Sequence, residues 1–505
     1  MIKIWRSRRG RTLLLGLLGW MLAIGFSVIP AFSQSPPNPF KVATEATFPP
    51  FEFQNNKTGQ IEGFDVDLIK AIGEKAGLTI ELVNLPFDGI IPALQSGSVQ
   101  AAISGMTITP ERARAIDFSR PYFKAGLAIA VQENNDTIKS FEDLKDKRIA
   151  VQIGTTGAAE AKKVPGAKIT TFDNAVLALQ ELVNGNVDAV VNDGPVTLYA
   201  IKDAGLKGVK IVGQLLTEEY YGIALAKNSP YVQLINDGLA KLIESGQYDV
   251  IYRKWFAAKP PELPLVAPSL ESGTENAFSW RQVFYNLIVL GVPVTLILTS
   301  LSFFFGLIGG TLVAIALISP YNWLRLLCRI YVDFFRGTPM LVQLFIIYFG
   351  LPNLIKEIGL SFTIDRLPAA ILALSLNVAA YLAEIMRGGI QSVDKGQWEA
   401  CESLGMSPLQ TMKDVIFPQA FRRMLPPLGN EFITLIKDTS LAAVIGFEEL
   451  FRQGQLIVAT TYKAFEIYIA VALIYLILTT LSSFGFKWLE QYMDPIGRAA
   501  KKGKV

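Results

Sequence analysis

The sequence predicts a soluble α/β region with two similar lobes, followed by an all-α membrane region, in one chain of 505 residues. The 51% hydrophobic content exceeds that of an ordinary soluble protein, so the excess is expected in membrane segments. Its distribution is uneven, because residues 40–260 have an ordinary soluble composition whereas 283–318 and 367–386 are nearly free of charge. Within the first half, short apolar runs alternate with helical patterns, which is typical of α/β domains.

The composition excludes several kinds of chemistry. The chain has no His and only two Cys, Cys328 and Cys401, which argues against imidazole catalysis, a zinc site or a disulfide framework. It has no GxxxxGK[ST] phosphate loop, so it is not expected to hydrolyse ATP itself. We therefore predict no enzymatic activity, no catalytic residues, no metal and no cofactor bound by this chain. The net charge of +3 gives no reason to expect nucleic acid as a partner.

The first 33 residues have the composition of an export signal. Several Lys and Arg residues precede a charge-free apolar run at 13–29, and Ala31-Phe32-Ser33 offers a cleavage site with small residues on either side of Phe32. The alternative is an uncleaved anchor helix. Either interpretation places the residues that follow outside the cytoplasm.

The soluble region at 40–258 is expected to contain mainly parallel sheets. Strands are predicted at 42–43, 80–85, 100–104, 148–153, 189–192 and 222–226, and helices at 64–76, 175–184 and 231–244. An internal repeat relates LQSGSVQAAIS at 94–104 to LVNGNVDAVVN at 182–192. Both copies read as a helix end, a Gly cap and a buried strand, which predicts one copy in each lobe unless the match is coincidental. Polar residues follow both copies, where ligands of open α/β sheets bind.

A Pro-rich and then polar linker at 259–282 leads to the membrane region at 283–490. About five spans are predicted, at 283–319, 330–351, 367–387, 439–460 and 465–485. The first is long enough for one tilted helix, with two short helices as the alternative. An odd number of spans places the basic tail at 491–505 inside. The distribution of cations supports this orientation, because the predicted cytoplasmic stretches contain Arg325, Arg329, Arg387, Lys395, Lys413, Arg422, Arg423, Lys501, Lys502 and Lys504.

A candidate anion site lies at the start of a predicted helix near residue 110. Thr109 is a favoured N-cap and Pro110 suits the first helical position. Arg112 then lies in the first turn, where backbone N–H groups favour an anion and a guanidinium can hold a carboxylate with two hydrogen bonds. The alternative is an arginine paired with a surface carboxylate.

Three motifs closely resemble bacterial periplasmic binding proteins for glutamine and basic amino acids. They are ATEATFPPFEF at 43–53, GFDVDL at 63–68, and GMTITPER at 105–112 with AIDFS at 115–119. The resemblance covers about 40–258. It implies the type II periplasmic-binding-protein fold, with two lobes and two hinge strands, which closes on its ligand.

The resemblance also implies roles for individual residues. Arg112 would hold the ligand α-carboxylate, with help from Thr107 and, from the second lobe, Thr156. The Gly105 carbonyl and the Asp193 carboxylate would bind the α-ammonium group. Two aromatic rings would sandwich the ligand side chain, an arrangement that suits an aliphatic stem or a cation; they are Phe48 and Phe87. Both rings could instead belong only to the core.

Two further residues bear on the choice of ligand. Glu45 corresponds to an acidic residue that faces the tip of the ligand side chain, and a carboxylate there would accept hydrogen bonds from an amide or a cation. Gln152 stands where the glutamine-selective relative has a lysine, so a group that repels cations is absent. We expect a site for basic amino acids and glutamine, with a surface role for Glu45 as the alternative.

The membrane region resembles the permease subunits of ATP-binding cassette (ABC) importers, over about 280–490. EACESLGMS at 399–407, followed by VIFPQA at 415–420, resembles their cytoplasmic coupling motif, and RGTPMLVQ at 336–343 resembles the polar amino-acid subgroup. In the family this helical hairpin, here at 396–425, docks into a groove of the ATPase. Glu399 would face that partner, small Ala400 would allow close packing and Gly405 would permit the sharp turn. Cys401 departs from the usual Ala, and the role of Arg336 is left open apart from its facing the bundle or an interface.

The predicted function is therefore amino-acid uptake. The outer domain would capture an amino acid and deliver it to a channel of two identical chains, driven by ATP hydrolysis in a separate subunit of the inner membrane complex. The short linker would keep the capture domain at high effective concentration beside the channel, so no free binding protein would be needed. Two alternatives fit less well. A glutamate-receptor-type channel would interrupt the binding domain with its pore and needs a filter loop, and a membrane-anchored enzyme needs catalytic residues.

Overall fold

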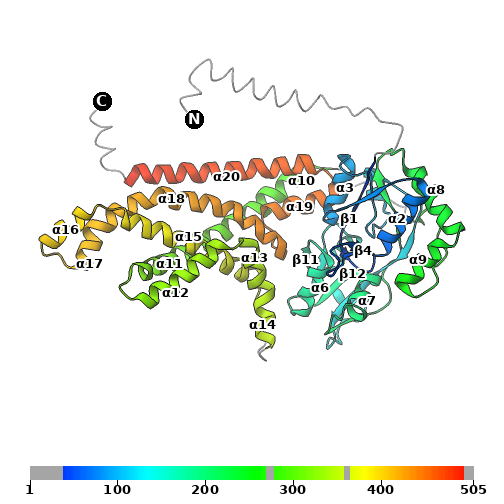
Figure 1. Ribbon diagram of the computed structural model, residues 1–505, viewed down its shortest axis with the longest axis horizontal. Helices are drawn as coiled ribbons and strands as arrows, with labels where there is room; N and C mark the ends of the chain where they lie inside the picture. The colour runs from blue at the N-terminus through cyan, green and yellow to red at the C-terminus, as the bar shows by residue number, and fades with distance from the viewer. Residues whose placement is uncertain (1–37, 269–277, 358–363, 494–505) are drawn as a thin grey trace, which may run out of the picture.

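The computed structural model describes residues 38–268, 278–357 and 364–493. A two-lobed α/β domain lies at one end of a long bundle of helices (Figure 1). The predicted signal segment at 1–33, part of the linker and most of the basic tail lie outside the described residues.

Each lobe is built on a five-stranded sheet. The first sheet has the order β5-β1-β6-β15-β7 and the second the order β11-β10-β12-β9-β13. The expectation of mainly parallel sheets was wrong, because each sheet combines two parallel and two antiparallel strand pairs. The antiparallel strands arise where the chain crosses between lobes and returns. The strands are β1(Phe40–Thr44), β5(Ile80–Asn84), β6(Ala101–Ala102), β7(Ile116–Phe118), β9(Leu127–Gln132), β10(Arg148–Gln152), β11(Lys168–Phe172), β12(Ala189–Asp193), β13(Val209–Val212) and β15(Ala224–Ala226).

The two lobes meet at a short antiparallel ribbon, in which β8(Phe123–Ala125) pairs with β14(Glu219–Tyr221). A small sheet of β2(Thr47–Phe48), β3(Glu52–Gln54) and β4(Ile61–Glu62) flanks the first lobe. The helices of the two lobes are α2(Phe64–Ala76), α3(Phe87–Gln95), α4(Pro110–Ala115), α5(Thr156–Ala161), α6(Ala175–Val183), α7(Gly194–Lys202), α8(Val232–Glu244) and α9(Gln247–Phe256), with the 3-10 turn η1(Glu142–Leu144).

The internal repeat does mark equivalent elements of the two lobes. Gly97 follows α3 and Gly185 follows α6, both with positive φ, of 72° and 79°. An L side chain is strained in this conformation, so glycine suits both positions. The strands that follow, β6 and β12, occupy the central position of their sheets. The repeat therefore reflects a duplicated architecture.

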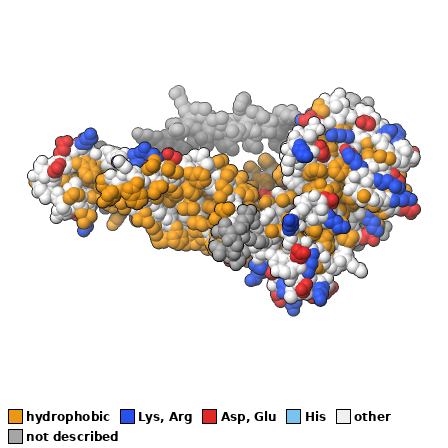
Figure 2. Space-filling model, turned by 60° about the horizontal axis from the view of Figure 1, so that its bottom comes forward, with side chains coloured by type: hydrophobic (Ala, Val, Ile, Leu, Met, Phe, Trp, Pro, Cys, Tyr) orange, Lys and Arg blue, Asp and Glu red, His pale blue; other side chains and the backbone are white. Residues whose placement is uncertain are grey.

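The second half is all-helical. Its elements are α10(Trp280–Phe284), η3(Tyr285–Gly291), α11(Val292–Ile318), α12(Asn322–Gly337), α13(Met340–Phe345), η4(Ile346–Gly350), α14(Leu351–Glu357), α15(Arg366–Gln391), α16(Lys395–Ser403), α17(Pro408–Gln410), η5(Thr411–Ile416), α18(Phe417–Asp438), η6(Thr439–Ile445), α19(Leu450–Thr461) and α20(Ala464–Met493). Figure 2 shows a broad hydrophobic surface along these helices, between the charged binding domain and the polar far tip. This distribution suits helices that face lipid.

The number of spans differs from the prediction of about five. Among the described residues, three helices are long and apolar enough to cross a membrane: Trp280–Ile318, Arg366–Gln391 and Ala464–Met493. The count rises to four if the pair Asn322–Gly337 and Met340–Gly350, bent by 109°, forms one span.

The span predicted at 439–460 is wrong. This stretch forms the 3-10 turn η6 and the 12-residue helix α19, separated by Gly446 with φ 72°. Twelve helical residues reach only about 18 Å, against the roughly 30 Å of the hydrocarbon core. Instead of crossing the membrane, α19 packs beside the binding domain and contacts α3. Its apolar residues are accounted for by protein packing rather than lipid.

The binding domain and the coupling motif lie at opposite ends of the long helices (Figure 1). α16 and α17 form the tip of the bundle, while α19 contacts α3 of the first lobe and Gly446, just after η6, lies against Thr170 of the second. A hydrophobic cluster continues from Phe172 and Leu179 of the second lobe to Leu344 and Tyr348 of the bundle. This separation agrees with one end outside the membrane and the other inside.

Candidate functional site

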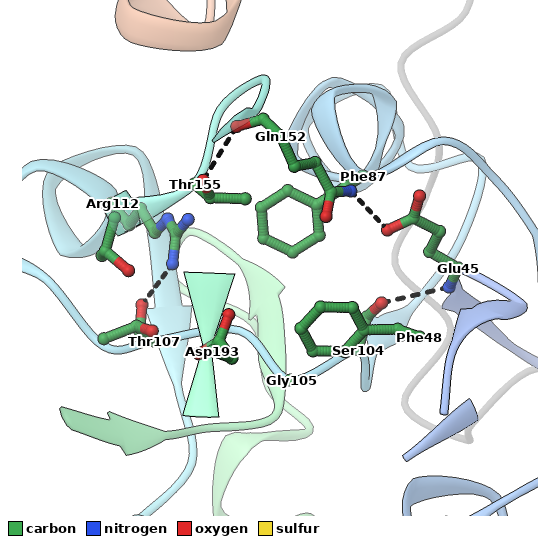
Figure 3. A pocket seen from close by; sticks show the side chains of 11 residues that line it. Glu45, Phe48, Phe87, Ser104, Gly105, Thr107, Arg112, Gln152, Thr155 and Asp193 are labelled. Carbon is green, nitrogen blue, oxygen red and sulfur yellow. Dashed lines mark hydrogen bonds between the residues drawn. The ribbon is translucent and has the colours of Figure 1, made fainter. Parts of the chain in front are cut away.

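A pocket between the two lobes contains all nine residues that the sequence predicted for ligand binding. Two more residues, Ser104 and Thr155, complete its lining. Arg112 and Thr107 lie at one end, Glu45 at the other, and the Phe48 and Phe87 rings lie between them (Figure 3). The pocket thus has a cationic end, an aromatic middle and an acidic end. The lining residues are Glu45, Phe48, Phe87, Ser104, Gly105, Thr107, Arg112, Gln152, Thr155, Thr156 and Asp193.

The cationic end is fixed by helix α4. Thr109 caps this helix by accepting a hydrogen bond from the Arg112 backbone N–H, as its sequence position predicted. The Arg112 side chain is buried, and its Nη1 and Nη2 donate to the carbonyls of Thr107 (2.7 Å) and Gly154 (2.9 Å). Its guanidinium lies 5.2 Å from the Phe87 ring centroid. A guanidinium has five N–H donors, so this arrangement holds the group in place and leaves donors for a carboxylate.

Gly105 allows the close approach of an aromatic ring. Its φ is +49°, and a Cβ at this position would lie 2.8 Å from Cε1 of Phe48. Its N–H donates to Asp65 Oδ2 (2.9 Å), which also accepts from the Tyr122 hydroxyl (2.7 Å). Asp65 is buried beneath the pocket, and burial raises its pKa to about 6. Asp65 therefore supports the backbone that faces a ligand.

At the acidic end, Glu45 and Gln152 join the two lobes. Gln152 Nε2 donates to Glu45 Oε2 (2.8 Å), while Thr47 Oγ1 donates to Oε1 (3.1 Å). Glu45 is buried, and burial raises its pKa to about 7 against the opposing effect of these hydrogen bonds. Gln152 Oε1 is buried and has no hydrogen-bond partner among the described residues. The acidic end thus offers the Glu45 carboxylate and Gln152 Oε1 as acceptors to a ligand that carries N–H donors, and Glu45 is not a surface residue.

Asp193 is likewise buried inside the pocket. Its Oδ1 accepts a hydrogen bond from the Tyr221 hydroxyl (2.5 Å). Burial, together with the nearby Glu219 carboxylate, raises the pKa of Asp193 to about 7. A cationic group placed beside Asp193 would favour its ionised form.

Glu219 is a residue that sequence reasoning missed. Its Oε2 accepts hydrogen bonds from the hydroxyls of Thr107 (2.6 Å) and Thr156 (3.0 Å). These hydroxyl protons therefore point to Glu219 rather than toward the pocket. In the sequence, Glu219 is the second of two adjacent glutamates, and this pair carries no signal of a buried site. Glu219 becomes part of one only because the segments that hold Thr107 and Thr156 meet it in the fold.

The lobes are closed on each other. Arg112 and Glu45 of the first lobe bind Gly154 and Gln152 of the second, at 2.9 and 2.8 Å. The pocket volume is only about 10 Å³, roughly the space of one water molecule. An amino acid can therefore enter only when the lobes move apart.

A much larger cavity, of about 1090 Å³, lies between the pocket and the helical region. Thr107, Arg112 and Thr156 line both spaces. Its other walls come from the start of the bundle and from α19, and include Gln282, Asn286, Leu456, Ile457 and Thr460. The cationic end of the pocket thus borders a space that the membrane region helps to enclose.

The predicted coupling motif forms a helical hairpin. α16 is followed by Gly405 with φ 72° and then by α17, whose cap residue Ser407 forms a capping box with Gln410. Glu399 is exposed, as expected of a residue that faces a partner. Ala400 is also exposed, so its expected close packing does not occur within this chain, where Cys401 is the buried residue. Arg336 faces α15, with its guanidinium 5.3 Å from the Tyr381 ring centroid.

Two family models match the chain. Residues 40–258 match "Bacterial extracellular solute-binding proteins, family 3", and residues 302–495 match "Binding-protein-dependent transport system inner membrane component". The second match and the three or four helices that could cross a membrane indicate a multi-pass protein of the inner membrane. Both families serve transport rather than enzymatic catalysis, and neither is a receptor channel of the glutamate-receptor type.

Individual proteins are similar to one half or the other. The chain is 42% identical to the glutamine transport system permease protein GlnP of Escherichia coli, over 43% of this chain and 98% of that protein. It is 39% identical to a probable histidine-binding protein of Neisseria gonorrhoeae, over 44% of this chain and 85% of that protein. An ancestral arginine-binding protein solved with arginine is 51% identical, covering 43% of this chain and 97% of its own, with a TM-score of 0.42.

Both halves therefore point to one process, with the capture site and the membrane passage in the same polypeptide. The chain belongs to the amino-acid ABC transporters, as a family 3 solute-binding domain fused to a permease domain.

Proposed function

We propose that this chain captures basic L-amino acids and glutamine outside the membrane. The observation that carries this proposal is the polarity of the pocket, which has Arg112 at one end and Glu45 beside Gln152 at the other. Arg112 would hold the α-carboxylate, while Asp193 and the Gly105 carbonyl would hold the α-ammonium group. The ligand stem would lie between Phe48 and Phe87.

The acidic end supports this choice of side chain. Glu45 Oε1 and Oε2 accept hydrogen bonds, and the buried Gln152 Oε1 can accept one, because it has no partner among the residues that the structure describes. Arginine, lysine, histidine and glutamine bring N–H donors to this position, whereas glutamate would bring a second carboxylate. The names of a histidine-binding and a glutamine-transport relative agree with this class.

Delivery would occur directly into the membrane region. The cavity of about 1090 Å³ borders both Arg112 and the helices at Gln282 and Thr460, so it supplies a route from the pocket to the permease. We propose that two identical chains form the channel, because each chain contributes one coupling motif and an importer needs two. A separate ATPase subunit would bind α16 and use ATP to drive the cycle.

The test is uptake of labelled arginine, lysine, histidine and glutamine by vesicles that contain the full chain and its co-purifying ATPase. Arg112→Ala should reduce uptake to background while the ATPase still co-purifies, because the variant removes the carboxylate contact and no assembly contact. Arg253→Ala, at an exposed arginine of α9, is the matched control and should transport normally. Normal transport by Arg112→Ala would contradict the carboxylate assignment, and tight binding of glutamate without arginine or lysine would contradict the substrate class.

A further inference from the structure

One buried cation of the permease region reaches into the binding domain. Arg452 lies in the first turn of α19 and is 0% exposed. Its Nη1 forms an ion pair with Asp173 Oδ1 (2.5 Å), and its Nη2 donates to the Thr171 carbonyl. Both partners belong to the second lobe, at and just after β11. Gln455 Oε1 also accepts from Nη1 (3.0 Å), so the guanidinium is held at this position.

Asp173 connects this ion pair to the pocket. Its carbonyl accepts a hydrogen bond from Gln152 Nε2 (3.3 Å), the same nitrogen that donates to Glu45 Oε2 (2.8 Å). The connection is built into the sheet, because Gln152 of β10 pairs with Phe172 of β11, immediately before Asp173. Arg452 is therefore connected to the acidic end of the pocket through Asp173 and Gln152.

The neighbouring charges have opposite effects on a ligand at this end. The negative charges of Asp88 and Asp173 reach Glu45, where they add to the burial that raises its pKa. The same negative field favours a cationic ligand side chain, because Glu45 is buried and charges acting on a buried position are poorly screened. Arg452 supplies the opposing positive charge and comes from the other domain. Its effect on the pocket therefore exists only while the binding domain sits on the permease.

We infer that Arg452 is a specificity residue of the docked transporter, which neutralises Asp173 behind the pocket and so weakens the hold on cationic side chains relative to neutral ones. Contact with the permease would thereby favour release of basic amino acids at the place where they are delivered. By thermodynamic reciprocity, a bound cation would weaken the contact between the domains to the same extent. This inference rests on the proposed binding of both arginine and glutamine.

The experiment compares the Kd values of L-arginine and L-glutamine for the full chain in lipid nanodiscs. Arg452→Gln should raise the affinity for arginine relative to glutamine by about fivefold or more, the lower end of typical coupling between sites. Asp173→Asn removes the opposite charge and should shift the ratio the other way. The double variant should return the ratio close to that of the wild type, and Arg452→Lys should retain it.

A control separates charge from simple loss of contact between the domains. The Tyr348 hydroxyl donates to Glu181 of the second lobe, away from the pocket, and Tyr348→Phe removes this contact without changing any charge. Its arginine-to-glutamine ratio should stay at the wild-type value. An unchanged ratio in both charge variants, or an equal shift in Tyr348→Phe, would overturn the inference. A wild-type chain that binds neither amino acid would overturn the proposed function itself.

Discussion

At the scale of single residues, the pocket is a set of buried groups whose properties depend on their surroundings. Glu45 and Asp193 have pKa values raised to about 7, chiefly by burial. The fold thus keeps two carboxylates close to half-ionised at neutral pH. A cationic ligand beside them would favour their ionised form. Beside Glu45, Gln152 Oε1 is an acceptor that has no partner within residues 38–268, 278–357 and 364–493.

These pKa values predict that ligand affinity depends on pH. A cation stabilises the ionised carboxylates, so binding releases protons, and affinity should rise as the pH increases through about 7. Arginine would require both Glu45 and Asp193 ionised, whereas the amide of glutamine can pair with either form of Glu45. Between pH 5.5 and 7, the affinity for arginine should therefore rise more steeply, by up to about tenfold per pH unit for each proton released.

Isothermal titration of the full chain at several pH values measures this difference, together with the protons released. Glu45→Gln is the matched variant, because it preserves size and removes the titration. In Glu45→Gln the pH dependence for arginine should fall to that for glutamine. A flat arginine profile in the wild type would contradict the assigned role of Glu45.

At the scale of elements, two short helices have distinct roles: α4 positions a pocket residue, and α19 contacts the binding domain. α4 is brief, yet its capped start positions Arg112. α19 is too short to cross the membrane and instead contacts the binding domain through Arg452 and Ala459. At the opposite end, α16 and α17 project from the bundle with exposed apolar side chains, Leu404 (80% exposed) and Leu409 (77%). Such exposure on a charged tip suits a surface that a protein partner covers.

The coupling hairpin gives a prediction at this scale. Glu399→Lys reverses an exposed charge on α16, so folding should change by no more than about 0.5 kcal/mol, as is usual for surface substitutions. ATP hydrolysis by the complex should persist while amino-acid uptake falls at least tenfold. Glu490→Lys reverses an exposed charge on α20, outside the motif, and should transport normally. Equal uptake by both variants would contradict the coupling role of α16.

At the scale of the whole molecule, both lobes meet the permease region at once. Arg452 and Gly446 lie against β11 of the second lobe, where a Cβ on Gly446 would approach Thr170 to 2.7 Å. Tyr462, at the end of α19, packs with the first lobe. Because a single segment touches both lobes, this contact depends on their closed arrangement.

A cross-link can test the closed contact. A Cβ at Gly154 would lie 3.7 Å from the Cβ of Ala459, within the usual range for a disulfide. In a chain with Cys328→Ser and Cys401→Ser, the pair Gly154→Cys and Ala459→Cys should form a disulfide under mild oxidation. Uptake should then stop and return on reduction, because the second lobe cannot move away from α19 while linked. The strained φ of +75° at Gly154 should cost about 1 kcal/mol, so each single Cys variant is the control.

Absence of the cross-link, together with normal folding of both single variants, would contradict the closed arrangement on the permease. Normal uptake by the fully cross-linked chain would contradict the need for the second lobe to leave α19.

The sequence alone determined the features that local chemistry encodes. Charge-free runs separated the membrane region from the soluble one, and the helix cap at Thr109 placed Arg112. Gly97 and Gly185 indicated the two lobes, because a positive φ after a helix favours glycine at the same position of each copy of the repeat. The nine site residues predicted from the resemblance to periplasmic binding proteins all line the pocket.

Contacts between residues that are distant in the sequence become known only from the folded chain. Glu219 lies 112 residues from the Thr107 hydroxyl that it accepts from, and Asp173 lies 279 residues from Arg452. Hydrophobicity could not distinguish α19 from a membrane span, since burial against protein and burial in lipid select the same apolar residues. Which charges pair over long range depends on how the whole chain packs, and so does the partner of an apolar helix face. No local sequence pattern predicts either.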